Sequence, residues 1–202
     1  MRCRMLAVMC LSFASALNIQ LDVTGIGALP ISLDDSLQAT SLLKAMTKGA
    51  QHECRLHRAE PLPPPGSVGP PYALVQFSLE GKLKAELYAV PQEGSTRIRR
   101  GHLCLIRGTS DFFISLAPDL EHDSWSEGMT VVGIVEEPEL TTLVEGALLA
   151  LPRHNFTHPS YGTLMSMLNA PVGCRVKPGP ARERDAEAGT IFNQRDTLQP
   201  EL

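Results

Sequence analysis

Short segments with the pattern of β-strands outnumber helical segments in this chain of 202 residues. Residues 19–23 alternate apolar and polar side chains, and Gly25 and Gly27 separate them from a second such stretch at 29–33, as in a hairpin. Further strands are predicted at residues 55–59, 72–79, 83–89, 103–107, 112–116, 130–135 and 172–176. Antiparallel strands joined by turns protect their edges by closing on themselves, so the pattern predicts a mainly β protein built on a closed barrel.

Two amphipathic helices interrupt the strands. The first is predicted after Asp34, Asp35 and Ser36, which offer N-cap chemistry, and it stops at Gly49. Its apolar face consists of Ala39, Leu42, Leu43 and Met46. The second begins near Pro138, ends at Pro152, and has the most regular apolar face of the chain: Leu140, Leu143, Val144, Ala147 and Leu148. We expect the two faces to cover the open ends of the barrel.

The chain ends differ in composition from the middle. Arg2 and Arg4 precede an apolar run, and Ala14-Ser15-Ala16 has the form of a cleavage site, so residues 1–16 are predicted to be a secretory signal peptide. The alternative is a buried first strand or helix. Residues 17–176 then form one domain, and the polar, aperiodic residues 177–202 a disordered tail. This organisation places the protein in the secretory pathway, with no stable membrane insertion once the signal is cleaved.

Cysteine usage is compatible with that compartment. Removal of the signal would leave Cys54, Cys104 and Cys174, an odd number, so at least one must be free or bonded to another chain. All three lie in apolar, strand-like surroundings, where buried thiols are common. We therefore expect buried thiols rather than a disulfide.

Charge and motifs exclude several kinds of function. A formal net charge of −4, with no basic stripe, argues against nucleic acid as a partner. The chain contains no Gly-x-Ser-x-Gly elbow, no phosphate-binding glycine loop, no His-Glu-x-x-His pair and no Cys-x-x-Cys pair. The sequence therefore predicts no metal and no cofactor.

Two separate segments carry a more specific signal. The first is Cys54-Arg55-Leu56-His57-Arg58, and the second is Ser110-Asp111-Phe112-Phe113-Ile114. With the order of elements between residues 19 and 176, they resemble the cyclophilin family of peptidyl-prolyl cis-trans isomerases. In that family a His-Arg pair ends one strand and a Phe-Phe-Ile strand floors a pocket for a proline ring. The resemblance implies an eight-stranded, cyclophilin-like antiparallel barrel capped by two α-helices.

The resemblance also implies a site. Arg58 would be the catalytic residue, because a guanidinium can donate to the lone pair that the prolyl nitrogen regains as the amide twists. Its substrate-binding neighbours would be Gln76, Phe113, Leu74, His57, Phe112 and Trp125. Phe112 and Phe113 are adjacent on a strand and face opposite sides, so one belongs to the core and Phe113 is the choice for the pocket. The partners would be proline-containing peptides or proteins, and the reaction needs no cofactor.

Departures from the family pattern keep other functions open. Phe77-Ser78 replaces the usual Gly-Gly, Asp111 replaces a glutamine, and Met129 stands where the family often has a histidine. The segment at residues 105–109 is shortened, and residues 61–71 form an unusually long, proline-rich loop. The alternative to an isomerase is a weakened or non-catalytic module that binds proline-containing peptides or serves as a scaffold. A third possibility is that the proline-rich loop occupies the domain's own groove.

Overall fold

The computed structural model describes residues 18–34, 39–41, 52–66, 72–81, 97–106, 108–121, 129–160 and 162–179, with 119–121 described by backbone alone. Several expectations concern residues outside this set. They are the signal peptide at 1–16, the strand at 83–89, Trp125, most of the first helix and nearly all of the tail.

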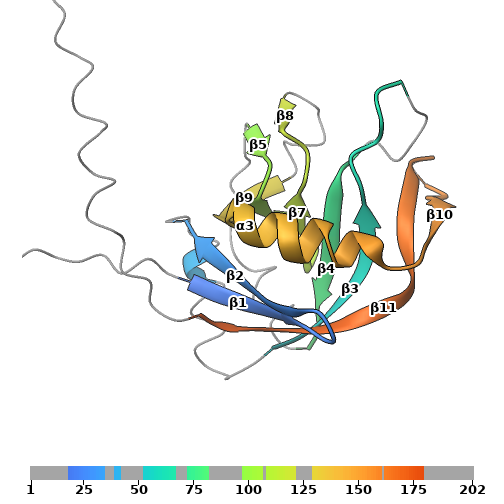
Figure 1. Ribbon diagram of the computed structural model, residues 1–202. Helices are drawn as coiled ribbons and strands as arrows, with labels where there is room; N and C mark the ends of the chain where they lie inside the picture. Colours follow the sequence, from blue (N-terminus) through green and yellow to red (C-terminus); the bar gives the residue numbers. More distant parts are fainter. Residues whose placement is uncertain are drawn as a thin grey trace, which may run out of the picture.

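Eight antiparallel strands close into a barrel, as the sequence predicted (Figure 1). Around the barrel they are β1 (Asn18–Val23), β2 (Gly27–Leu33), β9 (Met129–Ile134), β6 (His102–Ile106), β7 (Asp111–Ser115), β4 (Leu74–Leu79), β3 (His52–Glu60) and β11 (Leu164–Pro178). Pairing of β11 with β1 completes the closure. Because closure pairs the outer strands with each other, the barrel itself presents no free edge.

Within the described residues, three further strands lie outside this closed set and were not predicted. β10 (Arg153–Thr157) adds to β11 as the outer strand of a hairpin, at the right of Figure 1. β5 (Arg97–Arg99) and β8 (Asp119–Glu121) pair with each other in a small separate ribbon. β10 is exposed over most of its length, so it lacks the apolar alternation that identifies a half-buried strand.

The interior is filled by alternate residues of the barrel strands. Leu21, Leu56 and Val75 are each fully buried there, and the rings of Phe77 and Phe112 stack with centroids 5.6 Å apart. Since side chains alternate across a strand, the residues between these positions face outward. That outer face carries the candidate site described below.

The predicted second helix is confirmed, with mixed geometry. α3 (Glu137–Glu139) begins one residue before Pro138 and continues into η2 (Leu140–Glu145), a π-type turn, and η3 (Leu148–Ala150), a 3₁₀ turn. Leu140, Val144 and Leu148 are buried and join the barrel interior. Of the first helix, residues 39–41 are helical and Ala39 is buried. Among the described residues, no helix has the length and apolarity needed to cross a membrane.

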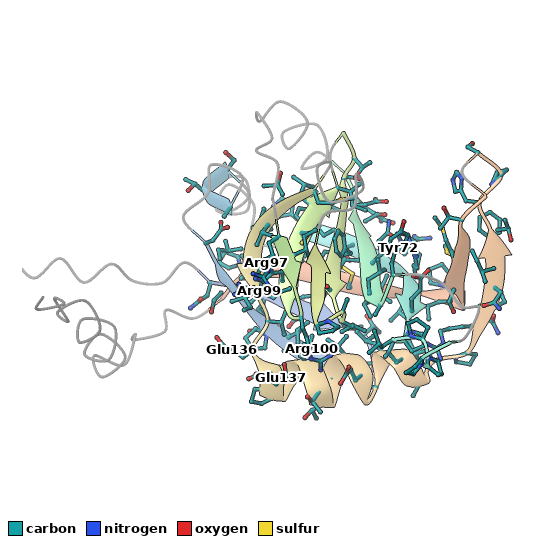
Figure 2. All side chains as sticks on the ribbon, turned by 90° about the horizontal axis from the view of Figure 1, so that it is seen from above. Tyr72, Arg97, Arg99, Arg100, Glu136 and Glu137 are labelled. Atoms are coloured by element: carbon teal, nitrogen blue, oxygen red, sulfur yellow. A yellow bond between two sulfur atoms is a disulfide. The ribbon has the colours of Figure 1, made fainter. Side chains whose placement is uncertain are left out.

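An arginine fastens the helix to the barrel. The Arg100 guanidinium donates to Glu137 Oε1 from Nη2 at 2.9 Å and to Glu145 Oε1 from Nη1 at 2.7 Å. Its Nη1 also donates to the Leu116 carbonyl at 3.2 Å, and Figure 2 shows Arg100 beside Glu137 at the start of the helix. The two carboxylates raise the pKa of Arg100 above its ordinary value.

The last strand is longer than predicted. β11 begins at Leu164, and its pairing with β3 is interrupted between Met167 and Val172. At its other end Lys177 and Pro178, expected at the start of the tail, still pair with β1. The Lys177 Nζ lies 2.6 Å from Asp22 Oδ2, so a cross-strand ion pair extends the domain past residue 176.

The prediction of three buried thiols was wrong for two of them. Cys54 and Cys174 are register partners on β3 and β11, with Cα atoms 4.8 Å apart, and form a disulfide. That Cα separation lies within the range a disulfide bridges. Cys104 is free and fully buried, and burial raises the pKa of its thiol. The pairing could not be read from the sequence, because 120 residues separate the partners and only the barrel closure brings them together.

Gly133 sits where β9 meets β2, at the seam joined by only two register pairs. A Cβ built on Gly133 would lie 2.5 Å from the Ser32 carbonyl oxygen, which is backbone and cannot rotate away. We expect Gly133→Ala to lower the free energy of unfolding by about 1 to 3 kcal/mol through overpacking. Urea denaturation followed by fluorescence measures this.

The control is Gly173→Ala in β11. Its new Cβ would meet only the Thr24 hydroxyl, at an ordinary 3.5 Å. We expect a change within about 0.5 kcal/mol for this variant. Equal effects of the two substitutions would show that the β2–β9 seam tolerates a side chain.

Candidate functional site

The predicted site residues fall on one row across the outside of the barrel. In the strand registers Arg58 of β3 pairs with Gln76 of β4, Gln76 with Phe113 of β7, and Phe113 with Cys104 of β6. Residues opposite one another on paired strands share a face, so this row places a cation, an amide and an aromatic ring side by side. Leu74, two residues from Gln76, lies on the same face.

The Arg58 guanidinium is buried and held from two sides. Its Nε donates to Glu60 Oε1 at 2.6 Å, and its Nη1 donates to Gln76 Oε1 at 3.2 Å. Its Cζ lies 6.0 Å from the centroid of the Tyr72 ring, within the range of a cation–π contact. Arg58 is 6% exposed and Glu60 is 0% exposed, so this charge pair is shielded from water.

Gln76 is fixed in turn by β7. Its Nε2 donates to Asp111 Oδ2 at 3.0 Å, and the Ser78 hydroxyl donates to Asp111 Oδ1 at 2.5 Å. An amide whose Nε2 is engaged by a carboxylate presents its Oε1 to the guanidinium. Asp111 therefore sets the orientation of Gln76 and through it that of Arg58.

The apolar floor of the site is a compact cluster separate from the barrel interior. Its buried members are Leu74, Ile98, Cys104, Phe113 and Met129, and Tyr72, Ile106 and Val131 pack against them. Phe113 is 0% exposed and Leu74 is 1% exposed. A proline ring therefore reaches the Phe113 ring only if a neighbouring side chain moves.

Three other predicted residues do not join this network. Phe112 faces the barrel interior and stacks on Phe77, so its assignment to ring binding is corrected. The register between β3 and β4 shifts at His57, whose Nδ1 lies 3.3 Å from the Arg55 carbonyl oxygen. Trp125 is outside the described residues.

Sequence reasoning missed two members of the site, Glu60 and Tyr72. Glu60 lies two residues after Arg58 on the same strand, and this spacing places both side chains on one face. The strand was predicted to end at residue 59, which removed Glu60 from consideration. Tyr72, labelled in Figure 2, directly follows the proline-rich loop and lies two residues before β4, so it reaches Arg58 from the end of that loop.

Burial leaves two polar atoms of the charge pair unsatisfied. Arg58 Nη2 and Glu60 Oε2 are both inaccessible to water and have no hydrogen-bond partner within the described part of the chain. Loss of hydration raises the pKa of Glu60, and this outweighs the opposing contacts with Arg58 and the Ser166 N–H. In this buried site Arg58 Nη2 can donate a hydrogen bond to a ligand or a water, and Glu60 Oε2 can accept one.

An apolar hollow of about 400 Å³ lies elsewhere, where β11 separates from β3. It is lined by Thr24, Leu151, Pro152 and residues 169–173. None of these side chains is charged, so the hollow offers surface for contact but no group for acid–base or electrostatic chemistry. Nor do the described residues contain a group of three or more His, Cys, Asp and Glu residues suited to hold a metal ion.

A search of protein-family models and a search of curated proteins found no match to this chain.

Proposed function

We propose that the protein is a cyclophilin-type module that binds proline-containing chains on the outer face around Arg58 and isomerises the Xaa-Pro bond. The observation that carries this is the row in which Arg58 donates to Gln76 beside Phe113. It combines a permanent cation, a hydrogen-bonding amide and an apolar floor, as the resemblance implies.

The proposed chemistry requires no proton transfer to the enzyme. Rotation about the Xaa-Pro bond breaks amide resonance, with a barrier of about 18 to 20 kcal/mol, and the prolyl nitrogen regains a lone pair in the twisted state. Donation from Arg58 to that lone pair is available in the twisted state and not in the planar amide, so it lowers the barrier. Leu74 and Phe113 would hold the ring, and Gln76 the adjacent backbone.

The second candidate is a module that binds proline-containing chains, or serves as a scaffold, without catalysis. The observation that favours it is the buried ion pair of Arg58 with Glu60, which satisfies the cation internally. The complete burial of Phe113 supports it as well. The two candidates share one surface and differ in whether Arg58 reaches the substrate.

The secretory pathway is the proposed location. The Cys54–Cys174 disulfide supports it, because disulfides persist chiefly in oxidising compartments. Clients would then be proline-containing proteins that fold or travel along that route. Expression of the full chain with a C-terminal tag, followed by fractionation and N-terminal sequencing, tests both this location and cleavage after Ala16.

The test of catalysis compares Arg58→Ala and Arg58→Lys with wild type in an NMR exchange assay on Xaa-Pro peptides. We expect kcat/KM to fall at least about tenfold in both variants, which equals about 1.4 kcal/mol of transition-state stabilisation. Arg58→Lys keeps the charge against Glu60 but loses the planar donor fork, so it separates catalysis from folding. Circular dichroism verifies that each variant is folded.

The matched control is Arg55→Ala. Arg55 lies on the same strand, but its side chain is 60% exposed and paired with Glu80. We expect wild-type kcat/KM for this variant. If the wild-type protein binds Xaa-Pro peptides but does not speed their isomerisation, the non-catalytic candidate is favoured. If the wild-type protein neither binds these peptides nor speeds their isomerisation, both candidates are rejected.

A further inference from the structure

Glu60 stands out because a fully buried carboxylate faces the proposed catalytic cation. The Nε of Arg58 and the backbone N–H of Ser166 both donate to Glu60 Oε1, at 2.6 and 3.0 Å. A hydrogen bond between a guanidinium and a carboxylate is roughly twice as strong as a bond between neutral groups. The contact therefore fixes the guanidinium and neutralises its charge within the site.

The ion pair with Glu60 limits which Arg58 donors are available to a substrate. Nη1 is used by Gln76, and Nη2 is buried with no hydrogen-bond partner among the described residues. A guanidinium held at Nε cannot shift toward a bound peptide without stretching the bond to Glu60. Because Nη2 has no partner among the described residues, only a hydrogen bond to the prolyl nitrogen that requires the guanidinium to move competes with the ion pair.

We propose that Glu60 is an internal counterion that restrains Arg58 and so limits the rate of isomerisation. This inference rests on the proposed function, since it concerns the same cation. Glu60 is a positioning residue here, because it acts on the substrate only through Arg58. Removing the negative charge of Glu60 should release the guanidinium and raise the rate of isomerisation.

The restraint also connects the site to the outer hairpin. Ser166 belongs to β11 at the level where β10 pairs with it, through the register Asn155 to Ser166. The hairpin therefore also holds the Glu60 carboxylate, at the same oxygen that accepts from Arg58. A movement of the hairpin would change the position of Glu60 and, through it, that of Arg58.

The charged groups around Glu60 determine how pH affects its protonation and its contact with Arg58. On its own strand it meets Arg58, β11 contributes the uncharged Ser166 N–H, and β10 contributes Arg153, whose Nη1 donates to the Ala59 carbonyl. From β7, Asp111 reaches Arg58 only through Gln76. Because its pKa is raised, Glu60 gains a proton before an ordinary carboxyl does as pH falls from neutral.

Glu60→Gln tests the inference. The amide oxygen can still accept from Arg58 and Ser166, but the negative charge is gone. We expect kcat to rise by about fivefold or more with little change in KM, because a neutral acceptor restrains the cation less than a carboxylate does. Wild-type kcat should also rise as pH is lowered from neutral, and the variant should lose this dependence.

The control is Glu53→Gln on the same strand. Glu53 is 60% exposed and pairs with Arg175, so we expect wild-type kcat and an unchanged pH profile. An unchanged or lower kcat in folded Glu60→Gln would overturn the inference. If Glu60→Gln does not fold, a wild-type kcat that does not change as pH is lowered would overturn the inference instead. Failure of Arg58→Lys to reduce activity would instead reject the proposed function.

Discussion

Reduction of the Cys54–Cys174 disulfide is expected to lower the free energy of unfolding by about 2 to 5 kcal/mol. The bond joins β3 to β11, and β11 also closes the barrel onto β1. The bond encloses a segment with a sequence separation of 120, so its loss frees a large part of the unfolded chain. The chain-entropy model assigns about 4.7 kcal/mol to a loop of about 100 residues. Urea titration with and without reductant measures the difference.

The variant pair Cys54→Ser with Cys174→Ser should reproduce the reduced wild type. Cys104→Ala is the control, since Cys104 is buried and takes no part in the disulfide. We expect that control to cost about 1 kcal/mol, from lost packing, and to keep the response to reductant. An identical urea midpoint for oxidised and reduced wild type would show that the barrel closure alone determines stability.

Strands such as β1 and β2 could be predicted from the alternation of buried and more exposed residues, whereas β4 and β7, which are buried on both faces, could be predicted from continuous apolar runs. Interior residues such as Leu21, Leu56 and Val75 each belong to a set of apolar residues at every second position of their strand. This alternation can be recognised in a short stretch of sequence. β10 lacks that pattern because it lies outside the barrel and faces solvent. The disulfide depends on the register between β3 and β11, which are distant in the sequence, so no single segment contains the information.

The site could be predicted in part for the same reason. Arg58, Gln76 and Phe113 were identified by motif, and their register pairing places them in one row. Glu60 was missed because an acid two residues beyond an arginine is common on exposed strands, and only burial distinguishes this one. The contribution of Tyr72 likewise depends on where the chain returns after the proline-rich loop.

Glu60→Ala is expected to lower the free energy of unfolding by about 3 to 5 kcal/mol, because it leaves the buried Arg58 charge without a counterion. The loss of stability arises mainly from the buried, uncompensated charge of Arg58, and not from lost packing alone. Replacing both partners, as Arg58→Met with Glu60→Leu, should recover most of that loss, since an apolar pair of similar size needs no hydration. Urea unfolding of Arg58→Met, Glu60→Leu and the double variant gives the coupling energy directly.

The exposed pair between Arg55 of β3 and Glu80, the residue after β4, supplies the comparison. Its Nε to Oε1 distance is 3.0 Å, similar to the buried pair, but the two side chains are 60% and 46% exposed. Because water screens both partners, we expect Glu80→Ala to cost only about 0 to 1 kcal/mol. A loss in Glu60→Ala no larger than this would mean that water reaches the Arg58 guanidinium. The same solvent access would leave Arg58 open to substrate and remove the basis for its restraint by Glu60, whereas a large coupling energy would support the proposed restraint.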